Sequence, residues 1–221
     1  MKKIISAVLI IAGLALLVSP LLMDKMVERQ VKISTEAIER ITVEEIEFNK
    51  EIKSGHKYTE IKDINPVSAA VAVSQFEDSN IIGLLRIPEL EIDLPILNGV
   101  SDANLMAGAG TMVPDLTMGA GNFSVASHYM KNPKLLFGNL LNAKEGMEVK
   151  ITDKRNIYEY VIYETVLVPE TALYMLDTDR ADERGKPIIS LMTCYYTSKN
   201  GKRFFALGEL VDTYEYEDDK F

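Results

Sequence analysis

The stretch Ile189–Leu210, ISLMTCYYTSKNGKRFFALGEL, contains two apolar runs separated by a polar loop. The first run leads into Cys194, the only cysteine of the chain, and the second begins directly after Arg203. Apolar runs of this length, joined by a loop that contains Asn and Gly, predict two β-strands paired as a hairpin. Because paired strands lie about 4.8 Å apart, the pairing would bring Cys194 and Arg203 to the same end of a sheet.

Similar short apolar runs, separated by Gly, Pro, Asn and Asp, recur from residue 80 onwards. The predicted strands are Gly83–Leu90, Ile92–Asn98, Gly121–His128, Met147–Asp153, Ile157–Val168, Ile188–Tyr195 and Phe204–Tyr214. Short helical turns are predicted at Asp102–Ala109 and Leu135–Ala143. Seven strands, or eight, in roughly 140 residues predict an all-β fold that closes, or nearly closes, into a barrel without exposed edges.

The N-terminus has a different composition, because Ile4–Met23 is a run of 20 residues without a charge. As a helix this run would be about 30 Å long, which is the thickness of the hydrocarbon layer of a bilayer. Lys2 and Lys3 precede it, so the positive-inside rule predicts a cytoplasmic N-terminus. A cleaved signal peptide is the alternative, but its apolar region is shorter, and here Pro20 would follow the cleavage site. We therefore predict an uncleaved transmembrane helix, with a single pass through the cell membrane and the remaining chain extracellular.

These features divide the chain into three predicted parts. Residues 1–23 form a cytoplasmic N-terminus and membrane anchor, residues 24–79 form a helical stalk and linker, and residues 80–221 form the barrel domain. Within the middle part, Asp24–Gly55 has apolar residues at loosely helical spacing among many charges, which predicts one or two amphipathic helices. The stretch His56–Ser79 is interpreted as a linker because it contains Pro66 and weakly patterned small residues.

The charge and the metal-ligating residues limit the classes of ligand. A net charge of −9 argues against nucleic acid as a partner, because phosphate binding requires a basic surface. One cysteine and one histidine in the barrel domain are too few ligands for a zinc site. No cofactor is predicted. Calcium is left open, because the acidic residues that could bind it lack the spacing of a calcium loop; they are Glu145, Glu148, Asp153, Glu164 and Glu170.

Three residues at predicted strand ends are candidates for catalysis. A single cysteine in an exported chain indicates a free reactive thiol or an intermolecular partner, with a buried packing residue as the structural alternative. A thiol nucleophile requires a proton acceptor and donor, and His128 is the only histidine of the barrel domain, although a lone histidine on an apolar strand can also be structural. Arg203 beside the thiol would favour the thiolate and would stabilise an oxyanion.

These residues also carry a resemblance to a known family. The segment SLMTC, Ser190–Cys194, followed by Arg203 nine residues after the cysteine, resembles the T-L-x-T-C…R signature of sortases. The segment SVASHYMKNPKLLFGNL, Ser124–Leu140, resembles their histidine region, and LLRIPELEIDLPILNGV, Leu84–Val100, resembles their first strand pair. The segments occur in the order found in the family and extend over about residues 81–214.

The resemblance is closest to the class A, housekeeping branch, which has an N-terminal anchor and no C-terminal span. Ser190 stands where the family signature usually has Thr, and Ser127 stands where many class A members have Gly before the histidine. These two departures leave the assignment of the histidine, cysteine and arginine intact, and they bear on the fit of the substrate.

The resemblance implies a transpeptidase of the Gram-positive cell surface that cleaves an LPXTG-like sorting signal. It implies that Cys194 attacks the Thr–Gly bond and forms a thioacyl enzyme, that His128 serves as acid and base, and that Arg203 holds the peptide and stabilises the oxyanion. The acceptor would be an amine of lipid II or of a peptidoglycan cross-bridge. The residues expected to line the peptide groove are Ala126, Ser127, Val168, Pro169, Met192 and Thr193.

Three alternatives remain at this stage. Another cysteine enzyme, such as a cysteine hydrolase or an L,D-transpeptidase, would also combine cysteine and histidine on a β-rich fold, but the His-x-x-Gly and Ser-x-Gly-Cys pattern is absent. A pilus-polymerising or sporulation-related branch of the family is the second alternative. The third is a non-enzymatic, membrane-anchored β-barrel binding module with an inert thiol.

Overall fold

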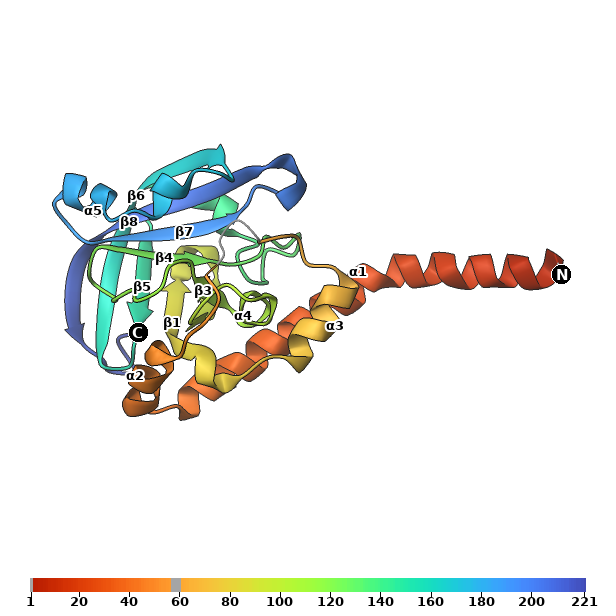
Figure 1. Ribbon diagram of the computed structural model, residues 1–221, viewed down its shortest axis with the longest axis horizontal. Helices are drawn as coiled ribbons and strands as arrows, with labels where there is room; N and C mark the ends of the chain where they lie inside the picture. Colours follow the sequence, from red (N-terminus) through yellow and green to blue (C-terminus); the bar gives the residue numbers. More distant parts are fainter. Residues whose placement is uncertain (1, 57–60) are drawn as a thin grey trace.

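The computed structural model describes residues 2–56 and 61–221, in which eight strands form a closed barrel preceded by helices (Figure 1). The strands are β1 (Ile81–Ile87), β2 (Ile92–Leu97), β3 (Ala109–Thr111), β4 (Asn122–Ala126), β5 (Glu148–Thr152), β6 (Asn156–Pro169), β7 (Ile188–Cys194) and β8 (Lys202–Glu215). The α-helices are α1 (Lys2–Arg40), α2 (Val43–Glu51), α3 (Pro66–Ser74), α4 (Asp102–Ala107) and α5 (Asp179–Arg184).

The closed barrel confirms the main prediction from the sequence. Around the barrel the strands follow the order β1-β2-β3-β4-β7-β8-β6-β5, and the seven predicted strands all occur, with ends that differ by a few residues. The eighth strand, β3, has three residues and no apolar alternation, so the sequence pattern did not reveal it. The pairs β2–β3 and β4–β7 are parallel, so the barrel is mixed.

The predicted helical turns are confirmed in part. The turn predicted at Asp102–Ala109 is α4, which begins after Ser101, whose side chain accepts a hydrogen bond from the backbone N–H of Asn104 at 3.2 Å. The turn predicted at Leu135–Ala143 contains the 3-10 helix Leu140–Asn142. The short helix α5 was not predicted, because only Ala181 of its six residues is buried and it therefore has no apolar face to detect.

The N-terminal segment begins with one continuous helix of 39 residues, α1. The predicted span Ile4–Met23 and the first predicted stalk helix are consecutive parts of this helix. In Figure 1 the first half of α1 projects away from the barrel, and its second half lies against the body of the protein. Within the described part of the chain, no helix combines the length and apolarity of a membrane-crossing segment, so the predicted span is not confirmed.

Helices α1, α2 and α3 pack onto the barrel and share its apolar clusters. Val27 of α1 and Ala69 of α3 belong to the main barrel cluster, and Ile38 of α1 and Ile46 of α2 belong to a second cluster that includes Ile81. Each of the two shorter helices begins with a capping box, formed by Thr42 and Glu45 for α2 and by Asn65 and Ser68 for α3. The predicted linker therefore contains a helix; its residues 57–60 lie outside the described residues. The division into three domains stays a prediction.

Asn98 connects the N-terminal helices to the barrel. Its side-chain amide donates to the backbone carbonyls of Asn49, Lys50 and Ile52 at 3.1, 3.2 and 2.9 Å. Its side-chain oxygen accepts from the hydroxyl of Ser54 at 2.8 Å. The side chain is buried, and it directly follows β2, so it satisfies the orphan carbonyls at the end of α2 and fixes this helix to the rim of the barrel.

We expect Asn98→Ala to lower the free energy of unfolding by about 2–3 kcal/mol, because it leaves several buried carbonyls without a donor. Urea unfolding of the full chain, followed by circular dichroism, measures this change. Asn142→Ala is the matched control, because Asn142 is exposed and bonds only to a neighbour, Asn139, through its side chain. Equal losses in the two variants would contradict the role of Asn98.

Candidate active site

The strand register brings Cys194, Arg203 and His128 together at one end of the barrel. In the antiparallel pair β7–β8, Cys194 lies opposite Arg203. In the parallel pair β4–β7, Ala126 lies opposite Met192, and His128 and Cys194 each follow two positions further along. The three candidate residues therefore stand side by side, in the order histidine, cysteine, arginine, on neighbouring strands about 4.8 Å apart.

Two of the predicted groove residues hold the ends of these strands in place. The Ser127 side chain donates to the carbonyl of Gly108 at 2.8 Å, and its backbone N–H donates to the carbonyl of Met192 at 3.1 Å. The Thr193 hydroxyl donates to the carbonyl of Ser127 at 2.9 Å. Because both side chains are buried and bonded within the protein, they position the backbone beside the candidate residues.

The other four predicted groove residues lie around the thiol in different ways. Ala126, Met192 and Val168 are buried and belong to the same apolar cluster as Cys194. Val168 also lies opposite Arg203 on β6, whereas Pro169 is exposed at the end of this strand. Ala126, Met192 and Val168 thus form an apolar wall beside Cys194, with one residue each from β4, β7 and β6.

Burial controls the protonation of the thiol and the imidazole. Burial lowers the pKa of His128 to about 4, although the carboxylates of Asp102 and Asp63 act in the opposite direction. Burial raises the pKa of Cys194 to about 11, an effect that the charge of Arg203 opposes and that the charges of Asp63 and Glu170 reinforce. At neutral pH both groups are therefore uncharged, and a thiolate forms when the proton passes to the imidazole.

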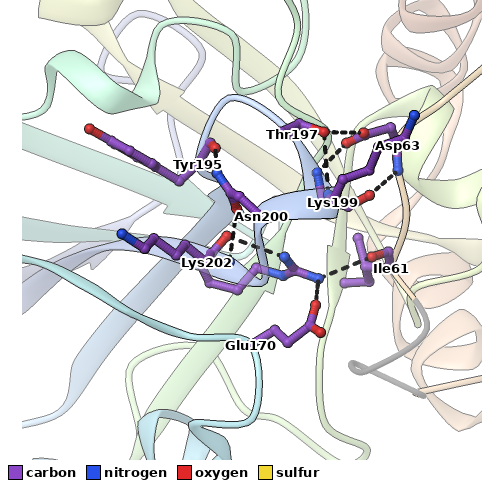
Figure 2. A network of polar contacts seen from close by, with 10 residues as sticks. Ile61, Asp63, Glu170, Tyr195, Thr197, Lys199, Asn200 and Lys202 are labelled. Carbon is purple, nitrogen blue, oxygen red and sulfur yellow. Dashed lines mark hydrogen bonds and ion pairs between the residues drawn. The ribbon is translucent and has the colours of Figure 1, made fainter.

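Arg203 is almost fully buried, at 1% exposure, and is held by three acceptors (Figure 2). Its Nη2 donates to the Glu170 carboxylate at 2.9 Å and to the carbonyl of Ile61 at 3.2 Å. Its Nη1 donates to the carbonyl of Lys202 at 3.2 Å. Its Nε is buried and has no partner within the described residues. A buried donor without a partner costs about 1–3 kcal/mol, so an oxygen of a bound substrate would be stabilised there.

The segment Ile61–Asn65 forms part of the site, although the sequence indicated only a linker. Asp63 accepts hydrogen bonds from the Thr197 hydroxyl and the Ser198 backbone N–H, both at 2.6 Å, and its own N–H donates to the Ser198 hydroxyl at 3.1 Å (Figure 2). Ile61 is buried in the apolar cluster that contains Cys194. No spacing or motif in the sequence could have placed this segment against the β7–β8 loop.

The acidic residues considered for calcium mostly pair with cations. Glu148 pairs with Lys150 at 3.2 Å, Asp153 with Lys50 at 3.4 Å, Glu164 with Arg180 at 3.0 Å and Glu170 with Arg203 at 2.9 Å. Among residues 2–56 and 61–221, no three histidine, cysteine or acidic side chains group together in a way that could hold a metal ion. Glu170 is a residue of the site whose role the sequence did not indicate.

Comparisons with known proteins agree with this geometry. The family model described as the Sortase domain matches residues 85–211. Sortase A of Listeria monocytogenes is 32% identical over 213 residues, which cover 96% of this chain and 93% of the relative. Sortase A of Streptococcus agalactiae is 33% identical over 87% of this chain and 78% of the relative.

The crystal structure of Listeria monocytogenes sortase A has a TM-score of 0.58 and 34% identity, and the match covers 63% of this chain and 93% of that one. Sortase C-3 of Streptococcus pneumoniae, with a TM-score of 0.63 and 21% identity over 86% and 95% of the two chains, shows the shared fold.

We expect alkylation of Cys194 by iodoacetamide to be slow at pH 7 and to rise by about tenfold per pH unit up to a pKa of about 11, because the thiolate is the reactive form. Mass spectrometry of the folded chain between pH 6 and pH 10 measures the rate. In the urea-unfolded chain the alkylation rate should rise at lower pH, because the thiol is no longer buried and its pKa is lower. A rate that is already constant around pH 7 would show a thiolate in the resting protein and would contradict this assignment.

We expect Glu170→Gln to accelerate this alkylation by about three- to tenfold at pH 8, because removal of the carboxylate lowers the pKa of Cys194. The amide keeps the size of the side chain and an oxygen that can accept from Arg203. Glu164→Gln is the control, since Glu164 lies on the same strand and pairs with Arg180 instead. Equal rates in wild type and Glu170→Gln would show that Glu170 does not influence the thiol.

Proposed function

The chain belongs to the sortase family and is a cysteine transpeptidase, and on this premise we propose that it cleaves an LPXTG-like sorting signal between Thr and Gly. It then joins the released surface protein to an amine of lipid II or of a peptidoglycan cross-bridge. Family membership sets aside the L,D-transpeptidase, the cysteine hydrolase and the binding module with an inert thiol. The full-length similarity to two proteins named Sortase A favours the class A branch over the pilus-polymerising and sporulation-related branches.

The observation that carries this proposal is the register of β4, β7 and β8, which sets His128, Cys194 and Arg203 side by side. In the proposed first half-reaction, the sulfur of Cys194 attacks the carbonyl carbon of the sorting-signal Thr while its proton passes to His128. Arg203 donates to the oxyanion, for which its unpartnered Nε is available. His128 then returns the proton to the amine of Gly, the C–N bond breaks and a thioacyl enzyme remains.

The apolar wall supports a role in binding the Leu-Pro part of the sorting signal. Ala126, Val168 and Met192 lie in the cluster that includes Cys194, and Val168 is the member that comes from β6, opposite Arg203. Ile61 occupies part of this cluster, and its carbonyl accepts from Arg203. A sorting peptide that binds here therefore displaces an internal apolar residue and takes over its hydrogen bond.

We also propose that the N-terminal part of α1 holds the enzyme at the cell membrane, with the N-terminus inside and the catalytic domain outside. Lys2 and Lys3 precede the uncharged run, and the side chains of Ile4, Ile5, Leu9 and Ile10 are 59–69% exposed on the projecting helix. Such a continuous apolar surface requires a cover. A tethered enzyme and a tethered substrate would meet at high effective concentration, so a weak affinity for the peptide is sufficient.

Incubation of the full chain with a fluorescent LPXTG peptide and triglycine, followed by mass spectrometry, tests the proposed reaction. We expect a ligated product in wild type, loss of both cleavage and ligation by at least about a thousandfold in Cys194→Ala and His128→Ala, and a loss of about a hundredfold or more in Arg203→Met. Each variant needs an unchanged circular dichroism spectrum. Ligation that persists in Cys194→Ala would refute the thioacyl mechanism.

A further inference from the structure

A cavity of about 510 Å³ borders His128. Its other walls come from the segment Lys62–Asn65, from α3 and from the start of α4. We call it the histidine cavity and define it by His128, Asp63, Asp102, Val100 and Ser68. Within the described residues, its lining includes neither Cys194 nor Arg203, and none of the six residues predicted for the peptide groove. A ligand in this cavity can therefore reach His128 without contact with the predicted groove residues.

The histidine cavity has a mixed polar and apolar lining, and its charged residues carry more negative than positive charge. The carboxylates of Asp63 and Asp102 and the cation of Lys62 lie in its lining, and both carboxylates act on the His128 ring. Asp63 already accepts from Thr197 and Ser198. Asp102 is exposed at the first turn of α4, and its carboxylate has no hydrogen bond within the described residues. Asp102 is thus the carboxylate with free acceptor capacity in this cavity.

His128 is a second and independent indication of a ligand. It is 3% exposed, and neither nitrogen of its ring has a hydrogen-bond partner in the part of the chain that the structure describes. Because His128 lies in the lining of the cavity, its ring nitrogens are free to form a hydrogen bond with a group that occupies the cavity. Asp102 could serve only to stabilise the N-terminus of α4, but this role would not account for an imidazole without a partner beside it.

The proposed reaction, on which this inference rests, requires a second binding site. In the thioacyl enzyme the sorting peptide occupies the apolar wall, so the acceptor must arrive from another direction and within reach of the base. We propose that the histidine cavity binds the amine acceptor, with the Asp102 carboxylate holding its ammonium group beside His128. The ligand is a primary amine that is cationic in solution, and Asp63 adds to the negative field.

The second half-reaction starts from the thioacyl enzyme and the bound amine. The ammonium held by Asp102 loses one proton to solvent in the cavity, and its nitrogen then attacks the thioacyl carbon. The new C–N bond forms, the amine gives a second proton to His128, and the C–S bond breaks with its electron pair on sulfur. His128 returns its proton to the sulfur, which restores the neutral thiol and imidazole. Asp102 touches the acceptor alone, so it acts as a binding residue and takes no part in the acylation.

The test compares a cationic with a neutral nucleophile in the full chain. Nα-acetyl-lysinamide is fully charged at pH 7.5, since a lysine side chain has a pKa of about 10.4, whereas hydroxylamine is mainly neutral there. With a saturating LPXTG peptide, we expect Asp102→Asn to raise the KM for Nα-acetyl-lysinamide by about tenfold and Asp102→Lys to raise it further. The rate with hydroxylamine should change by less than about twofold, because this nucleophile has no charge for the carboxylate to bind. Asp179→Asn, an exposed acidic residue of the short helix α5, is the matched control and should change neither rate.

Each outcome decides one of the two proposals. Equal losses with both nucleophiles, or no loss with either, would overturn the acceptor site. A wild type that forms a thioacyl adduct on Cys194 and reacts with hydroxylamine, but with neither Nα-acetyl-lysinamide nor triglycine, would also overturn it. The absence of any thioacyl adduct in the intact mass of wild type, with hydroxylamine and without it, would instead refute the proposed function. The intact mass thus tests whether the thioacyl enzyme forms, and the dependence on the amine tests the acceptor site.

Discussion

The parallel pairing of β4 with β7 is the constraint on which the site depends. Antiparallel strands that follow each other in sequence can be joined by a hairpin, as β7 and β8 are, but a parallel pair needs a long crossover. Here the chain between β4 and β7 forms β5, β6 and α5 before it returns. Because parallel strands end at the same edge, residues 66 positions apart in sequence, His128 and Cys194, meet at one rim. A shift of one residue in either strand would turn the side chains of that strand to the opposite face of the sheet, and His128 and Cys194 would no longer share a face.

Burial of this rim determines what the site can do. An imidazole and a thiol removed from water both favour their neutral forms, so Cys194 and His128 form no thiolate–imidazolium pair at rest, and the neutral sulfur is a weak nucleophile. Arg203 cannot become neutral, and its burial is tolerated because Glu170 and two backbone carbonyls accept from it. The same carboxylate that makes the arginine acceptable also opposes its effect on the thiol. In the proposed reaction, activation is left to the substrate, which would bring an acceptor for the remaining arginine donor and would displace Ile61.

Much of the barrel could be predicted because it obeys local rules. Each of the seven predicted strands had an apolar run bounded by turn residues, and Cys194 and Arg203 were placed together by a hairpin, which is a local structure. The three-residue strand β3 gave no such pattern, since its partners on both sides supply its pairing. The contacts of Asp63 with Thr197 and Ser198, and of Arg203 with Ile61, connect residues more than 130 positions apart and depend on how an N-terminal segment folds back. Charge and spacing in the sequence do not encode that geometry.

The N-terminal segment consequently forms part of the candidate site as well as the projecting helix. Helix α3 supplies a wall of the histidine cavity, the stretch Lys62–Asn65 supplies another, and the Ile61 carbonyl completes the acceptors of Arg203. A barrel that began at β1 would keep the histidine, cysteine and arginine in register, because these depend only on strand pairing. It would lose one buried acceptor for the arginine, the carboxylate of Asp63 and the enclosed space beside the histidine. The register thus sets the thiol, the arginine and the histidine at one rim, and the folded-back segment forms the cavity that we propose for the amine acceptor.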